Sequence, residues 1–178
     1  MSLDLEELVQ RHFELNREFR QLLKMKDGHQ LGPPATQQEV AKIETKFGVH
    51  LPKDYRSFLL RHNGWSHFDG ELDLLSTHQM LDKRIRNQVD SIASSLRDAE
   101  VIDSKTVFIV EGSPTGVEIA FYDLSSQGSG QSPTFHHWDG EELDEFSSFT
   151  DYLEFSAEAM ADLVKEEKAR FRKQKGKP

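Results

Sequence analysis

The densest group of side chains that could do chemistry is a run of five carboxylates late in the chain. Two carboxylates can act as a general acid and a general base only where their surroundings hold their pKa values apart. A short acidic run without Lys or Arg is solvated throughout and lacks this asymmetry. It could instead bind a basic protein, because complementary charge accelerates association and rejects wrong partners. The candidate partner-binding residues are Asp139, Glu141, Glu142, Asp144 and Glu145, with Trp138 beside them.

The acidic run also has a simpler interpretation, a solvated surface that keeps the protein soluble. The aromatic residues near it in sequence leave the same choice open. Phe135, Trp138 and Phe146 could anchor a protein interface or could belong to the core.

Eight histidines raise the question of a metal site. His136 and His137 are adjacent, so on a strand they point to opposite faces and cannot both bind one ion in the usual way. One other set is nearer to a candidate site: His62, His67, Asp69 and His78. Its spacing matches no zinc motif. We expect no metal and no other cofactor.

The chain lacks the usual motifs of nucleophilic catalysis and phosphate binding. It has no Cys, and its Gly128-Ser129-Gly130 segment is too rich in Ser and Gly to hold a preorganised site. Residues 112–116 contain glycines but no Lys, and a strand rather than a helix should follow them. We therefore predict that the protein is not an enzyme, and a hydrolase with an unrecognised site is the third alternative.

The formal net charge of −9 is unevenly distributed along the 178 residues. Residues 1–97 are neutral, residues 98–164 carry −14, and residues 165–178 carry +5. The acidic middle argues against nucleic acid, which needs Lys and Arg on the docking face. No apolar run approaches the roughly 18–20 residues of a membrane span, and the acidic N-terminus is unlike a signal peptide. We expect a cytoplasmic protein that binds neither nucleic acid nor membrane.

Helix signals dominate the first third of the chain. A capping box predicts a helix from Asp4 to about Lys24, and a second capping box predicts another over 36–48. A third helix opens at Pro52, and Asn63-Gly64 should end it because both residues tolerate positive φ. A longer helix is predicted over Ser76–Leu96.

The strand signals come mostly after this helix. They predict strands over Glu71–Leu75, Thr106–Val110, Val117–Asp123 and Thr134–Trp138, a loop over Leu124–Ser132, and a last helix capped by Ser147 or Ser148. This order indicates an α+β fold with a central, mainly antiparallel sheet flanked by helices. We expect one domain over 31–164, with an N-terminal helix over 1–30 packing on it and a basic tail over 165–178 that is frayed from about Arg170.

The segment from Leu31 to Gly64 resembles the SUKH superfamily, which includes the Smi/Knr cell-wall-assembly regulators and many bacterial toxin-immunity proteins. A Leu-Pro-x-x-Tyr sequence and an Asn-Gly pair around one short helix carry the resemblance, which extends to about Met160. It implies an α+β fold, no enzymatic activity, no cofactor and, in bacterial members, binding of toxins that are often nucleases. The residues that it marks as structural are Leu51, Pro52, Tyr55, Asn63, Gly64 and Trp65.

The resemblance and the acidic middle together predict a non-enzymatic protein-binding module. We expect an immunity protein that neutralises a basic toxin domain, such as a nuclease, through an acidic surface. The alternative is a regulatory scaffold of the cell-wall-assembly-regulator type that acts on host proteins. Neither the composition nor the motifs indicate an oligomeric state.

Overall fold

The chain divides into two compact units. Residues 30–149 form one, called here the sheet unit, and residues 1–29 and 150–178 together form the other, called the helical unit. The predicted packing of residues 1–30 on the rest of the protein stays a prediction. The computed structural model describes residues 4–26, 28–70, 72–102, 107–112, 118–124 and 133–175.

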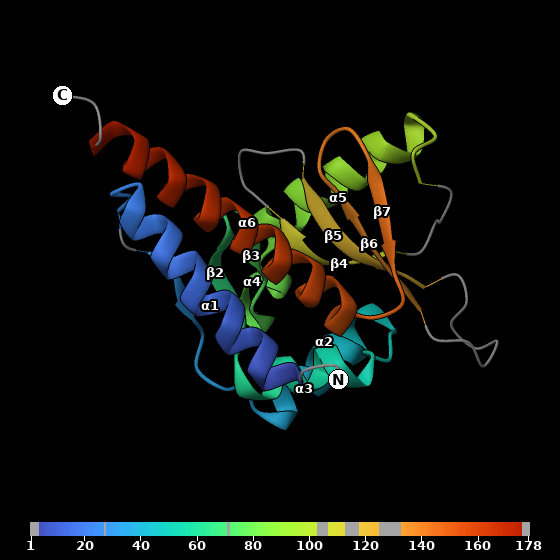
Figure 1. The fold of residues 1–178 in the computed structure, drawn as a ribbon. Coiled ribbons are helices and arrows are strands. Elements are labelled where there is room, and N and C mark those ends of the chain that lie inside the picture. Colours follow the sequence, from blue (N-terminus) through green and yellow to red (C-terminus); the bar gives the residue numbers. More distant parts are fainter. Residues whose placement is uncertain are drawn as a thin grey trace. The chain divides into compact units, whose positions relative to one another are not determined.

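The sheet unit is built on one antiparallel sheet, in which seven strands of the described residues lie in sequence order. Each strand pairs with the next along the chain. The strands are β1 (Gln30–Leu31), β2 (Trp65–Asp69), β3 (Leu72–Leu74), β4 (Val107–Gly112), β5 (Ile119–Asp123), β6 (Thr134–Trp138) and β7 (Leu143–Phe146). The prediction of an α+β fold with a central antiparallel sheet is therefore confirmed, although β1, β2 and β7 were not expected as strands (Figure 1).

Four helices accompany this sheet among the described residues of the sheet unit: α2 (Gln37–Phe47), α3 (Lys53–Arg61), α4 (Thr77–Leu81) and α5 (Lys83–Asp98). The capping box of Thr36 and Glu39 forms as predicted at the start of α2. The prediction of one helix over Ser76–Leu96 is wrong. Asp82 is extended (φ −67°, ψ 122°), and its carboxylate accepts hydrogen bonds from the backbone N–H groups of Arg84 and Ile85, so it ends α4 and caps α5.

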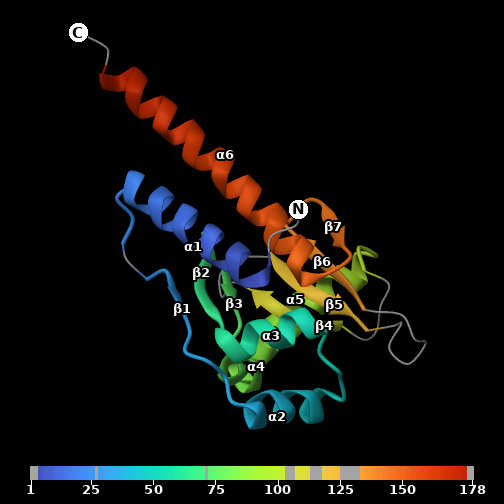
Figure 2. The same ribbon diagram turned by 60° about the horizontal axis from the view of Figure 1, so that its bottom comes forward.

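Alternation along β5 gives the sheet two apolar faces. Ile119 and Phe121 pack in one cluster with Ala93 and Leu96 of α5, which Figure 1 shows behind β4 to β6. Tyr122 points to the opposite face, where an aromatic cluster forms from α3, β5, β6 and the start of the last helix. Its members are Tyr55, Phe58, Tyr122, Phe135 and Phe149. In Figure 2, α2, α3 and α4 lie close together beside this sheet.

The helical unit contains α1 (Leu5–Leu22) and all but the first residue of α6 (Phe149–Lys175). The predicted capping box of Asp4 and Glu7 opens α1. The described part of α6 runs to Lys175, and the expectation of a tail frayed from about Arg170 stays a prediction. One cation of this tail, Lys168, pairs with Glu18 of α1 at 2.6 Å.

Two predicted connections cannot be compared with the structure, because residues 113–117 and 125–132 lie outside the described ranges. These contain most of the predicted turn over 112–116 and of the predicted loop over Leu124–Ser132. Among the helices that the structure describes, none combines the length and the apolar character that crossing a membrane requires.

Candidate partner-binding surface

The acidic run forms the turn and the returning strand of the β6–β7 hairpin. Trp138 pairs with Leu143 at the closed end of this hairpin. The carboxylate of Asp139 accepts hydrogen bonds from the backbone N–H groups of Glu141 and Glu142, both at 2.8 Å. These bonds lower the pKa of Asp139, because they favour its charged form. The turn therefore fixes the Asp139 carboxylate against the backbone of Glu141 and Glu142, and all three side chains are exposed.

The last two carboxylates of the run lie on β7, where consecutive side chains point to opposite faces. Asp144 is opposite His137 on one face, and Glu145 is opposite His136 on the other. The five predicted partner-binding carboxylates therefore do not share one surface. Sequence reasoning placed them together by adjacency because it did not foresee the strand.

Trp138 is partly buried and packs against the apolar cluster beneath α5. Phe135 is fully buried in the aromatic core of the other face, so it cannot anchor a partner. Phe146 is half-buried, with its ring centre 6.5 Å from that of Phe135. Of the three aromatic candidates, Phe135 is a core residue, and the role of Trp138 in partner binding stays a prediction.

The strand register adds two carboxylates that sequence reasoning did not assign to the surface. Ile119 pairs with Trp138, so Glu118 enters β5 at the level where Asp139 leaves β6. Asp69 lies at the same end of the sheet, because it pairs with Leu72 at the start of β3. We call Asp69, Glu118, Asp139, Glu141 and Glu142 the acidic sheet end.

Electrostatic repulsion links three of these carboxyl groups, those of Asp69, Glu118 and Asp139. The pKa of Asp69 is raised to about 6, first because surrounding protein displaces water from its carboxyl group and then because of the Glu118 carboxylate, although Asp69 keeps exposed surface. Burial also raises the pKa of Glu118, and Asp139 raises it further. Among the described residues, no Lys or Arg forms an ion pair with a member of the acidic sheet end. Like charges are thus crowded here without a cation to offset them.

The histidines beside the hairpin are neutral at neutral pH. Burial lowers the pKa of His136 and of His137 more than their neighbouring carboxylates raise it. The His136 ring stacks on Phe121, with ring centres 5.3 Å apart. These side chains therefore add no positive charge that would oppose the acidic sheet end.

The candidate metal ligands are distributed over three elements and serve local structure. His62 caps the end of α3, His67 donates its backbone N–H to the carboxylate of Asp73, and His78 lies in α4. Within the described ranges, no three His, Asp or Glu side chains are grouped so that they could hold a metal ion.

The Asn-Gly pair joins the end of α3 to the start of α4. The Asn63 side chain accepts a hydrogen bond from the Thr77 backbone N–H at 2.8 Å and donates one to the Thr77 hydroxyl at 2.9 Å. Of this pair, Gly64 adopts a positive φ of +88° and Asn63 does not. A Cβ on Gly64 would lie 2.7 Å from the backbone N of Ser76, so a side chain does not fit there.

The remaining motif residues surround this turn. Pro52 is the N-cap of α3 and not its first helical residue. Leu51, Tyr55 and Trp65 are buried, with exposed fractions of 8%, 0% and 1%. The motif side chains thus lie in the interior or at element ends, away from the acidic sheet end.

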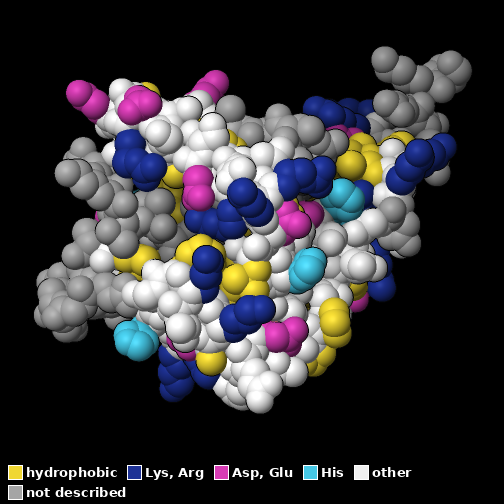
Figure 3. Space-filling view, turned by 180° about the vertical axis from the view of Figure 1, so that it is seen from behind, with side chains coloured by type: hydrophobic (Ala, Val, Ile, Leu, Met, Phe, Trp, Pro, Cys, Tyr) yellow, Lys and Arg dark blue, Asp and Glu magenta, His cyan; other side chains and the backbone are white. Residues whose placement is uncertain are grey.

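Figure 3 shows one face of the protein in space-filling form. Lys and Arg side chains are scattered across it, and Asp and Glu side chains lie between them. The described side chains on this face form no continuous acidic patch.

Comparison with known proteins gives a match to a family model and a short match to one bacterial protein. The model of the SMI1/KNR4 family (SUKH-1) matches residues 34–154, which is most of the chain. An uncharacterized protein of Bacillus subtilis (strain 168), YnaB, is 47% identical over 49 residues. This alignment covers 28% of the present chain and 33% of YnaB, so it spans a third of that relative.

Proposed function

The chain belongs to the SMI1/KNR4 family (SUKH-1), and from this premise we propose that it is a non-enzymatic protein of the immunity type. It binds a basic toxin domain through the acidic sheet end and so blocks the groove in which the toxin binds its substrate. The observation that carries the proposal is the crowding of Asp69, Glu118 and Asp139. Burial and repulsion from a neighbouring carboxylate raise the pKa values of Asp69 and Glu118.

A basic partner suits this surface for a physical reason. Crowded carboxylates repel one another, and a Lys- or Arg-rich surface replaces that repulsion with attraction when it docks. Nuclease domains carry such basic surfaces because they bind phosphate groups. A fixed set of carboxylates can therefore occupy the groove that a nuclease uses for its substrate.

The test compares two double variants that change net charge equally. Glu141→Lys with Glu142→Lys alters the acidic sheet end, and Glu158→Lys with Glu166→Lys alters exposed positions of α6. The probe is the toxin domain encoded next to this gene. We expect association with that domain to slow about tenfold at low salt for the first variant, and to change much less for the second.

Growth rescue provides a second measurement. Cells that produce the toxin domain should survive with the wild-type protein and with the α6 variant, and should lose protection with the sheet-end variant. Equal association rates for both variants would refute the role of the acidic sheet end. Absence of binding by the wild-type protein, without rescue, would refute the immunity function and favour the scaffold alternative.

A further inference from the structure

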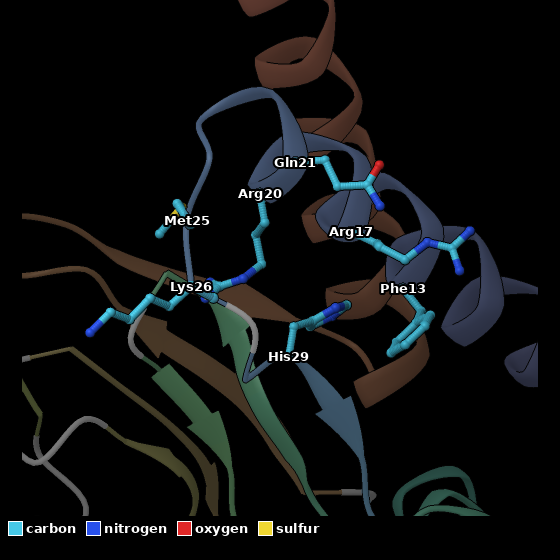
Figure 4. Close-up of a pocket in the computed structure, with 7 residues that line it drawn as sticks. All are labelled: Phe13, Arg17, Arg20, Gln21, Met25, Lys26 and His29. Carbon is cyan, nitrogen blue, oxygen red and sulfur yellow. The ribbon is translucent and has the colours of Figure 1, made fainter.

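A second site candidate lies in the helical unit, between α1 and the chain that follows it. A pocket of about 390 Å³ opens there, which is in the usual range of roughly 300–1,000 Å³ for small-molecule sites. Figure 4 shows the seven residues that line it: Phe13, Arg17, Arg20, Gln21, Met25, Lys26 and His29. Three of them are cationic and none is acidic.

Arg20 is the central feature of this pocket. It is only 9% exposed, and one of its terminal nitrogens donates to the backbone carbonyl of Lys26 at 2.8 Å. Among the described residues no carboxylate pairs with it. A guanidinium has five N–H donors, so most of its donors remain available to a ligand. Burying a cation is costly unless hydrogen-bonding or anionic groups surround it, and a bound anion would serve that role here.

Two further cations and an aromatic pair surround Arg20. Positions 13, 17 and 20 lie on one face of α1, because helical residues four and three apart are neighbours. Arg17 is 56% exposed at its side chain and pairs with Glu14, which does not line the pocket. The rings of Phe13 and His29 stack with centres 4.4 Å apart and form an aromatic wall beside the cations.

We propose that this pocket binds a small phosphate monoester. A phosphate dianion can accept hydrogen bonds from the Arg20 guanidinium and from Arg17 or Lys26 at the same time. A single carboxylate has fewer oxygen atoms and less charge with which to bind all of these donors. The organic part of the ester would rest against the Phe13–His29 stack. This inference is independent of toxin binding, which involves residues of the other unit.

The test titrates the full-length protein with AMP, inorganic phosphate, adenosine and citrate, using calorimetry and amide chemical shifts. We expect saturable binding of AMP, weaker binding of inorganic phosphate, and none of adenosine, with shifts concentrated in residues 13–29. Lys26→Gln, at an exposed position, should weaken AMP binding several-fold. Arg20→Gln should weaken it about tenfold or more.

Arg11→Gln is the matched control, because Arg11 is an exposed arginine of the same helix that does not line the pocket. It should bind AMP like the wild type. Far-ultraviolet circular dichroism determines whether Arg20→Gln folds. If this variant does not fold, Lys26→Gln tests the site instead. Equal losses in Arg11→Gln and Lys26→Gln, binding of adenosine as tight as that of AMP, citrate binding tighter than AMP, or no saturation by AMP would each overturn the proposal.

Discussion

The protonation of His12 should set part of the pH dependence of stability. His12 lies in α1 with no exposed surface, and its Nε2 atom is 3.0 Å from the Ser156 hydroxyl of α6. Its pKa is lowered from 6.5 to about 3, first by burial and then by repulsion from His29. The native protein therefore holds His12 neutral at every pH above about 3.

The sign and size of the effect follow from linkage. Below pH 6.5 the unfolded chain binds a proton at this histidine and the native chain does not, so the free energy of unfolding falls as pH falls. Between pH 8 and pH 5 the loss from His12 is about 2 kcal/mol. Asp69 acts in the opposite sense, because its native pKa is raised and the native state binds the extra proton as pH falls through about 6.

Comparing the pH dependence of the free energy of unfolding between the wild type and a His12 variant isolates the contribution of this histidine. His12→Gln keeps a hydrogen-bonding side chain opposite Ser156 but does not titrate. It should be less stable than the wild type at pH 8, yet should lose about 2 kcal/mol less between pH 8 and pH 5. His50→Gln, at an exposed position, is the control for a substitution of the same kind.

Urea unfolding followed by far-ultraviolet circular dichroism is the suitable assay. Both tryptophans, Trp65 and Trp138, lie in the sheet unit, so their fluorescence would not report directly on α1. Parallel pH profiles for the wild type and His12→Gln would refute the reasoning, because they would mean that the native state binds a proton at His12 as readily as the unfolded state does.

Two further predictions concern the sheet unit. Asn63→Ala removes both hydrogen bonds to Thr77 and should lower the free energy of unfolding by about 1–3 kcal/mol in tryptophan-monitored urea titrations, whereas Asn87→Ala on the exposed side of α5 should change it little. Binding of the toxin domain should weaken about tenfold from pH 7.5 to pH 5, because the Asp69 carboxyl is protonated below about 6. Asp69→Asn should flatten that pH dependence, measured by calorimetric titration of the toxin domain at each pH.

The sequence predicted those elements whose signals are local. The capping boxes at Asp4 and Thr36 formed because each needs only a side chain and a backbone group three residues apart. The break at Asp82 was missed because the apolar spacing continues through it, although Asp is a strong N-cap and could have been recognised as one. Strand β7 was missed because its apolar residues, Leu143 and Phe146, are three apart and not two.

The candidate surface was harder to predict than the fold, since strand register, and not adjacency, decides which charges meet. Asp144 and Glu145 are neighbours in sequence but point to opposite faces of the sheet. Glu118 and Asp69 are distant from the hairpin in sequence, yet the strand pairing and the coupling of their pKa values bring them into one group with Asp139. Only the strand order could have revealed this.

Strand β2 links the family motif to the acidic sheet end. It starts at the buried Trp65, directly after the Asn63-Gly64 turn, and ends at the exposed Asp69. Between them the register shifts, and His67 takes a positive φ of 52° while its backbone N–H binds the Asp73 carboxylate. This irregularity sets where Asp69 leaves the sheet.

The two ends of β2 are under different physical constraints. Trp65 cannot change without leaving a cavity in the core, whereas Asp69, Glu141 and Glu142 keep exposed surface and can be replaced without loss of packing. One scaffold can therefore carry different charges at its sheet end and so select different partners. On this reasoning, an exchange of charge at the sheet end should redirect binding while leaving the free energy of unfolding nearly unchanged.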